Sequence, residues 1–98
     1  MITQKSIEEL KNRVDIVDII SRYISVNKSG RNYVCVCPFH DDKIQSMSIN
    51  TQDNFYHCFA CKAGGDAITF VMEYEKINYP EAIEKIATMI NFTLEYDD

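Results

Sequence analysis

The stretch CVCPFH at residues 35–40 places two cysteines and a histidine within six positions. A second stretch, HCFACKAGGD at residues 57–66, holds the other two of the chain's four cysteines. A gap of two residues within each pair lets both side chains of one turn converge on a single ion, and zinc prefers thiolate and imidazole ligands. We therefore predict one zinc site with four protein ligands: Cys37, His40, Cys58 and Cys61.

The predicted zinc ion has a structural role rather than a catalytic one. Four protein ligands fill a tetrahedron and leave no coordination position open for water. Two spaced pairs in one short chain form a specific signal, whereas either pair alone would be weak.

Cys35 and His57 are alternative ligands because each lies close to a predicted ligand in the sequence. We expect Cys35 to pack as a small apolar group, on the opposite strand face from Cys37. We expect His57 to make an ordinary hydrogen bond and to point away from Cys58, because adjacent residues of a strand face opposite sides.

A redox site is a second alternative, because the spacing of Cys58 and Cys61 also suits thiol exchange. That interpretation leaves Cys37 and His40 without a role. It also lacks the strand–helix–strand setting of thiol oxidoreductases, so the metal site is favoured.

The length of 98 residues predicts a single domain, residues 1–98, or a fragment of a longer protein. A core of this size is marginal, and small domains often add a structural metal. The N-terminus has no basic start followed by an apolar run, and no apolar run approaches the length of a membrane span. We expect a cytoplasmic protein without membrane contact, where clustered cysteines more often bind metal than form disulfides.

The formal net charge is -5, which argues against a strongly basic nucleic-acid-binding domain. The charge is unevenly distributed along the chain. Residues 22–62 hold five basic and three acidic side chains, whereas residues 63–98 hold two basic and eight acidic ones. The positive charge therefore accompanies the cysteines, and acidic helices follow them.

Patterns at both ends of the chain predict helices. Ser6 with Glu9 indicates a helix that begins at Ser6, and Asp15 caps a second one over 16–23. Asp66 caps a helix over 67–75, and Asn78 caps a last helix that extends to residue 91.

The middle of the chain predicts a small antiparallel sheet. Residues 32–36, 47–50 and 55–59 have strand composition, residues 27–31 read as a turn, and residues 51–54 as a polar loop. Residues 92–96 fit a short final strand or the start of a linker. The expected fold class is α+β, with a zinc-ribbon-type sheet between N- and C-terminal helices.

Ordered motifs along nearly the whole chain resemble the zinc-binding domain of bacterial DnaG-type primases. The resemblance rests on CPFH at 37–40, FYHCFAC at 55–61 and GGDAITFV at 64–71, and extends to segments 14–17, 28–33 and 79–83. This sequence departs from the family pattern at Gln45, Met47 and Cys35, which alters the surface beside the metal. The resemblance implies a zinc-ribbon sheet that binds single-stranded template DNA where RNA primers begin.

Single-stranded DNA is held by bases that stack on aromatic rings and by cations that contact phosphates. Phe55 and Tyr56 are adjacent, so one of them belongs to the core, and Phe39 is a further stacking candidate. The residues that we predict to bind DNA are Lys28, Arg31, Tyr33, Lys43, Phe55 and Lys62.

Primer synthesis requires divalent cations held by clustered acids, and no such cluster is visible in this sequence. The resemblance therefore implies a non-catalytic domain of a longer primase, whose polymerase core binds Mg²⁺ and meets this domain in cis or in trans. It also implies contact between the parent protein and the replicative helicase of the primosome. The alternative function is a zinc-stabilised protein-interaction module that uses its acidic helices.

Overall fold

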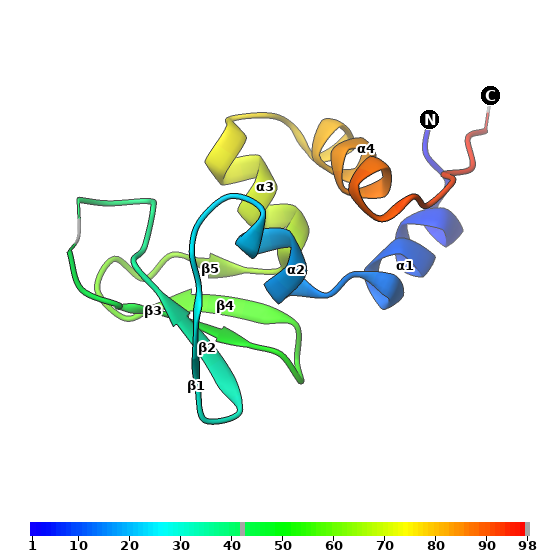
Figure 1. Ribbon diagram of the computed structural model, residues 1–98. Coiled ribbons are helices and arrows are strands. Elements are labelled where there is room, and N and C mark those ends of the chain that lie inside the picture. Colours follow the sequence, from blue (N-terminus) through cyan, green and yellow to red (C-terminus); the bar gives the residue numbers. More distant parts are fainter. Residues whose placement is uncertain (42, 98) are drawn as a thin grey trace.

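The computed structural model describes residues 1–41 and 43–97 of the protein (Figure 1). Two helices precede the sheet in the chain, α1 (Gln4–Arg13) and α2 (Ile16–Ser21), and two follow it, α3 (Ala67–Glu75) and α4 (Tyr79–Ile90). The strands are β1 (Asn27–Ser29), β2 (Asn32–Cys35), β3 (Met47–Asn50), β4 (Phe55–Cys58) and β5 (Gly64–Gly65). The predicted α+β fold, a small antiparallel sheet with helices at both ends of the chain, is confirmed.

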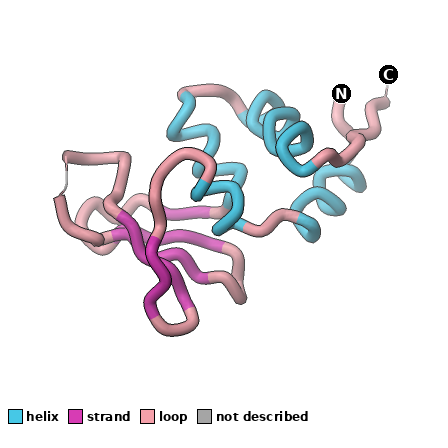
Figure 2. The backbone as a smooth tube through the Cα atoms, viewed as in Figure 1, coloured by secondary structure: helices cyan, strands magenta, loops and turns pink. Residues whose placement is uncertain are grey.

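The five strands form an antiparallel sheet in the order β1-β2-β3-β4-β5, so each strand pairs with its neighbour in sequence. One row of paired residues crosses it through Tyr33, Ile49 and Tyr56, and the last two are fully buried. We call the side of these residues the inner face. The helices gather on one side of the sheet (Figure 2).

The opposite side is the open face. It is defined by the row Asn27, Val34, Ser48, His57 and Gly64, in which each residue pairs with the next. None of these five side chains is fully buried. Successive strand residues alternate between faces, so Phe55 belongs to the open face and Tyr56 to the inner face.

Three of the four predicted helix starts are confirmed by their caps. The side chains of Asp15 and Asp66 accept hydrogen bonds from the backbone N–H groups of Val17 and Thr69. Asn78 forms a reciprocal capping box with Glu81. Each cap satisfies an N–H group that the first helical turn leaves without an internal partner.

The predicted start of the first helix at Ser6 was wrong. The N-cap is Thr3, whose Oγ1 accepts the N–H of Ser6 at 3.1 Å. Ser6 lies inside α1 and is buried, because its Oγ accepts a long-range hydrogen bond from the N–H of Glu95 at 3.0 Å. The second helix is also shorter than predicted and ends at Ser21.

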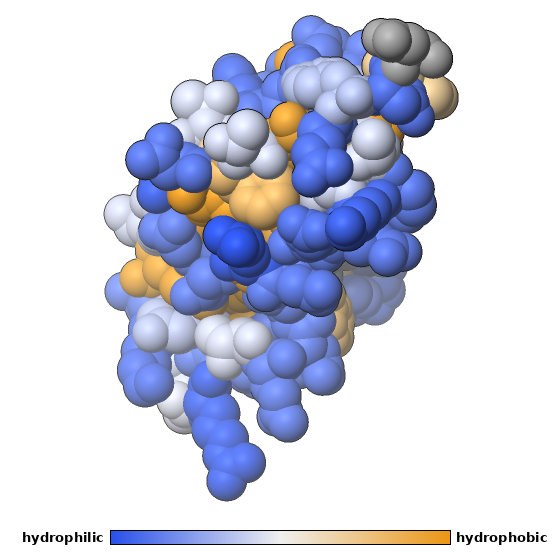
Figure 3. Space-filling view, turned by 90° about the vertical axis from the view of Figure 1, so that its right-hand side faces the viewer, coloured by the Kyte–Doolittle hydropathy of each residue, from blue (hydrophilic) through white to orange (hydrophobic). Residues whose placement is uncertain are grey.

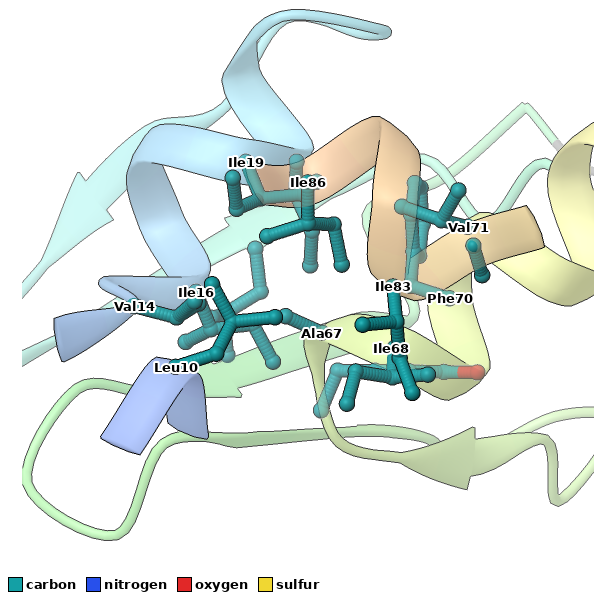
Figure 4. Close-up of a cluster of buried hydrophobic side chains, with 14 of the residues drawn as sticks. Leu10, Val14, Ile16, Ile19, Ala67, Ile68, Phe70, Val71, Ile83 and Ile86 are labelled. Carbon is teal, nitrogen blue, oxygen red and sulfur yellow. The ribbon is translucent and has the colours of Figure 1, made fainter. Parts of the chain in front are cut away.

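The core lies between the inner face of the sheet and the four helices. Figure 4 shows the side chains of α1, α2, α3 and α4 converging on one cluster. The fully buried members include Leu10, Ile16, Phe70, Ile83 and Ile86. The four helices therefore pack together through their apolar faces.

Two glycines serve different purposes in the sheet. Gly30 has a φ of 62° in the turn that joins β1 and β2, where the predicted turn at 27–31 is narrower than expected. Gly65 has a φ of 152°, and a Cβ there would lie 2.8 Å from the Cβ of Thr69. The unpredicted strand β5 therefore depends on a residue without a side chain, which lets α3 begin directly against the sheet.

Residues 92–97 return to the N-terminus. Thr3 N–H donates to Glu95 O at 3.0 Å, Asp97 N–H donates to Met1 O at 2.8 Å, and Ile2 pairs with Tyr96. The prediction of a short final strand is therefore met by a single antiparallel bridge. Figure 3 shows the end of the molecule with both termini, where apolar side chains occupy only a small area among hydrophilic ones.

Helix length and hydropathy also bear on membrane contact. No helix within the described residues combines the length and the apolar character that crossing a bilayer requires.

Candidate metal centre

The four predicted ligands come from two turns at one end of the sheet. Cys37 and His40 follow β2, Cys58 is the last residue of β4, and Cys61 lies in the turn before β5. Their ligand atoms, three sulfurs and one imidazole nitrogen, all lie within 4.8 Å of one another. Among the described residues this is the single group of three or more Cys, His, Asp or Glu side chains with that geometry.

The spacing between these atoms fits a tetrahedral zinc ion. A zinc–sulfur bond of about 2.3 Å requires about 3.8 Å between two sulfur ligands. Cys37 Sγ and Cys61 Sγ are 3.7 Å apart, and Cys58 Sγ and His40 Nδ1 are 4.0 Å apart. A disulfide would need about 2.05 Å between the sulfurs, and all four cysteines are free.

Backbone hydrogen bonds favour the thiolate form of Cys58. The N–H of Cys61 donates to Cys58 Sγ at 3.4 Å, and Ser46 Oγ lies 3.5 Å from the same sulfur. Burial opposes ionisation, but these hydrogen bonds prevail and lower the pKa of the Cys58 thiol to about 6.

Cys37 differs from Cys58 in its ionisation. Burial raises the pKa of the Cys37 thiol to about 12, although the N–H of Phe39 donates to its sulfur at 3.5 Å. A bound cation ionises a coordinated thiol by its own charge. The Cys58 thiol therefore ionises more readily than an ordinary thiol, whereas the Cys37 thiol requires the charge of a bound cation.

The alternative ligands lie outside the cluster, but the reason predicted for Cys35 was wrong. Strand residues two apart share a face, and Cys35 and Cys37 both point inward with 1% of their surface exposed. Cys35 instead pairs with Met47 and belongs to the apolar core. His57 points away from Cys58 as predicted, and its ring contacts Phe59 at 5.0 Å between centroids.

Aromatic packing supports the turn that carries Cys37 and His40. Phe39 lies 5.4 Å from Phe70 and 6.0 Å from Tyr56, measured between ring centroids. Tyr56 is therefore part of the core with 1% of its surface exposed, whereas Phe39 is partly buried and packs against that core. Of the adjacent pair Phe55 and Tyr56, Phe55 is the exposed one, with 41% of its surface accessible.

The open face beside the metal centre carries an aromatic stripe of Phe55, His57 and Phe59. These residues alternate with the inward-facing Tyr56 and Cys58, and Phe59 extends β4 by donating its N–H to Ser46 O at 3.0 Å. Phe59 is 64% exposed. His57 and Phe59 were not among the predicted DNA-binding residues, although their two-residue spacing from Phe55 could have indicated a shared face.

The remaining predicted DNA-binding residues do not form one surface. Lys28 and Tyr33 lie on the inner face at the β1 edge, where Lys28 Nζ sits 5.5 Å above the Tyr33 ring. Lys62 lies beside the stripe and donates to Phe59 O at 3.2 Å. Arg31 is exposed in the β1–β2 turn, and Lys43 is exposed in the loop that follows His40.

The family pattern of the CHC2 zinc finger matches residues 2–98, which is almost the entire chain. The chain belongs to the CHC2 zinc finger family. The predicted resemblance to the zinc-binding domain of bacterial primases is thereby confirmed.

Relatives of this CHC2 zinc finger chain include DNA primases from two bacteria. The DNA primase of Campylobacter jejuni is 60% identical over 96 residues, which are 98% of this chain and 16% of the relative. The DNA primase of Helicobacter pylori is 48% identical over 97 residues, which are 99% of this chain and 17% of the relative. The chain therefore spans about a sixth of the length of these primases.

A solved structure shares the fold. The crystal structure of the Aquifex aeolicus primase, with its zinc-binding and RNA polymerase domains, matches with a TM-score of 0.86 and 41% identity. The match covers 94% of this chain and 22% of that one.

Proposed function

We propose that this CHC2 zinc finger domain holds one structural zinc ion and presents single-stranded template DNA to the polymerase core of a DNA primase. The ligands would be Cys37, His40, Cys58 and Cys61. Their order along the chain is Cys, His, Cys, Cys, and their spacing fits a tetrahedral ion. When bound, zinc would cross-link the two turns and fix the end of the sheet.

The observation that carries the DNA-binding proposal is the exposed aromatic stripe. The hydration of an exposed phenyl ring is unfavourable. Stacking of a base on the ring removes this apolar surface from water and is therefore favourable. Phe55 and Phe59 offer two such rings on one face, and His57 lies between them on β4. A single strand with unpaired bases fits this arrangement, whereas a duplex hides the faces of its bases.

Basic side chains near the stripe would contact the phosphates. Lys62 lies directly beside Phe59, and Arg31 and Lys43 are exposed on neighbouring loops. Lys28 and Tyr33 would hold the strand where it leaves the sheet at the β1 edge. If two or three of these side chains contact phosphates at once, binding should be weak, with a slope of roughly -1.4 to -2 in log affinity against log salt.

The domain itself would be non-catalytic. Among the described residues the only close group of potential metal ligands is the Cys and His cluster, and no cluster of acids accompanies it. Nucleotide addition, with its Mg²⁺ ions, would take place in the polymerase core of the longer protein, and the helicase would be met by that protein as a whole.

Fluorescence anisotropy with a labelled 12-nucleotide single strand tests the proposal. Phe59→Ala should weaken binding about fivefold or more, because stacking on one aromatic ring contributes about 1–3 kcal/mol per base. Arg31→Ala should weaken binding and flatten the salt dependence by about 0.7 in slope. Tyr79→Ala and Lys5→Ala, exposed on helices away from the stripe, are the matched controls.

Two results would reject the DNA-binding proposal. One is a zinc-loaded chain that binds no single-stranded DNA. The other is a set of variants in which Phe59→Ala and Tyr79→Ala weaken binding equally, because that pattern would place the contact away from the stripe.

A further inference from the structure

A pocket of about 350 Å³ lies beside the Cys37–Pro38 turn. Its apolar walls are formed by Ile24, Val36 and Pro38, together with Cys37, and the polar side chains at the pocket are those of Ser25, Asn27 and Gln45. The volume is at the small end of the range of about 300–1,000 Å³ for ligand sites in proteins. It therefore suits a compact ligand rather than a peptide segment.

The lining of this pocket carries no charged side chain. A carboxylate or phosphate group would therefore find no cation within it. Ser25, Asn27 and Gln45 are exposed, so their hydroxyl and carboxamide groups are accessible to a ligand. The pocket offers apolar walls together with neutral donors and acceptors, and a nucleobase has apolar faces and a polar edge.

Two residues that line the pocket, Asn27 and Val36, belong to the open face that carries the aromatic stripe. Asn27 pairs with Val34 across β1 and β2, and this row continues through Ser48 to His57 in the stripe. Val36 lies two residues beyond Val34 and is 41% exposed between two buried cysteines, so it continues the open face.

The distance along this row matches a short single strand. From β1 to β4 there are three strand spacings, or about 14 Å, since neighbouring strands lie about 4.8 Å apart. Stacked nucleotides rise about 3.4 Å each, so about four of them cover that distance. A single strand that crosses the sheet from the stripe on β4 toward β1 would therefore bring a base within reach of the pocket.

We infer that this pocket binds one unpaired nucleobase of the template strand, and that Gln45 and Asn27 read its polar edge. The inference rests on the proposed DNA-binding function and adds a source of base preference to it. Aromatic stacking tolerates every base, whereas a carboxamide distinguishes bases by the pattern of donors and acceptors on their edges.

The test compares the zinc-loaded chain with its Gln45→Ala and Asn27→Ala variants on labelled dA, dC and dT 12-mers. Each carboxamide removed should reduce the affinity ratio between the best and the worst homopolymer by about fivefold or more. Gln4→Ala, an exposed glutamine in the first turn of α1, is the matched control and should leave the ratio unchanged.

A spectroscopic measurement locates the contact directly. In ¹H–¹⁵N spectra, the side-chain amide signals of Asn27 and Gln45 should shift when the preferred 12-mer is added, and the Gln4 signals should not. Replacing one nucleotide at a time with an abasic site should reveal one position whose loss weakens binding by the wild-type chain and has little effect on Gln45→Ala.

The failures of the two proposals have different signatures. If Phe59→Ala weakens binding while both carboxamide variants keep the wild-type ratio and their amide signals do not shift, DNA binding stands and the pocket assignment is overturned. If the wild-type chain binds none of the homopolymers, the proposed function fails and the pocket assignment fails with it.

Discussion

Cys58 belongs to the metal cluster and to the sheet at once. Its side chain is fully buried on the inner face, it pairs with Met47 on β3, and its sulfur accepts the N–H of Cys61. A change at this residue therefore affects the ion and the end of β4 together. Cys35 is similarly buried two strands away, on the other side of Met47, but lies outside the ligand group.

Cys58→Ser should abolish the binding of one zinc per chain and lower the free energy of unfolding severely. Structural zinc contributes about 10–16 kcal/mol in small modules, which is comparable to the total stability of about 5–15 kcal/mol of a domain. Metal analysis by mass spectrometry and thermal unfolding would measure both effects. Cys35→Ser is the control and should retain the zinc; zinc loss in Cys35→Ser with retention in Cys58→Ser would contradict the ligand assignment.

Residue spacing allowed the metal cluster to be predicted, because ligands two residues apart in a turn converge whatever the rest of the fold does. The exposed ring of Phe59 was harder to predict. Nothing in the local sequence says that the strand pairing of β4 continues past Cys58, and that pairing depends on Ser46 in a distant segment. The face of the sheet on which an aromatic side chain lies depends on the strand with which its backbone pairs.

The helices are joined to one another by a polar network on the surface. The hydroxyl of Tyr23, which lies just beyond α2, donates a hydrogen bond to the carboxylate of Glu75 at the end of α3. Lys85 of α4 binds the other oxygen of the same carboxylate. The hydrogen bond from Lys85, which has the larger effect, and the hydrogen bond from Tyr23 hold the pKa of the Glu75 carboxyl below its ordinary value. One carboxylate thus connects three parts of the helical layer.

Glu75→Gln should lower the free energy of unfolding by about 1 kcal/mol at pH 7, the size of a partly exposed charged hydrogen bond. A carboxyl whose pKa is lowered by folding stabilises the protein above its ordinary pKa, and this stabilisation is lost as the pH falls through the folded-state value. The difference from wild type should therefore shrink in acid. Urea unfolding at neutral and acid pH measures it.

Glu8→Gln, at an exposed position of α1, is the control for this network and should match wild type at both pH values. A difference between Glu75→Gln and wild type that stays constant from neutral to acid pH would contradict the role of the charge.

At the scale of elements, local signals predicted the helices well and the edges of the sheet less well. Caps at Asp66 and Asn78 act within one turn, so the sequence contains the whole interaction. The misplaced start at Ser6 has a different origin, because its hydroxyl is used by Glu95, which is 89 residues away. Strand β5 consists of two residues, both glycines, and it forms because β4 is available as a pairing partner.

The metal cluster and the two chain termini lie at opposite ends of the molecule. The open face belongs to the sheet and the metal cluster lies at one end of it, whereas both termini lie beside the helices at the other end of the molecule (Figure 1). Residues 92–97 are fixed to the N-terminal segment by hydrogen bonds on both sides of the Ile2–Tyr96 bridge. A primase core attached beyond this point would therefore leave the open face accessible to a template.

Removal of this domain from a full-length primase should reduce de novo primer initiation far more than extension of a supplied primer. Within the described residues the single close group of potential metal ligands is the Cys and His cluster, and the proposed contribution of the domain is to position the template. Loss of positioning can cost about 100-fold in rate or more. A supplied primer is already paired to its template, so extension should depend less on the domain. Comparing both activities with and without residues 1–98 measures this difference.

Phe59→Ala in the full-length enzyme should reproduce part of the initiation defect while the zinc content stays at one per chain. Equal loss of initiation and extension would indicate a general stabilising role, and primer synthesis by the 98-residue chain alone would place the chemistry in this domain.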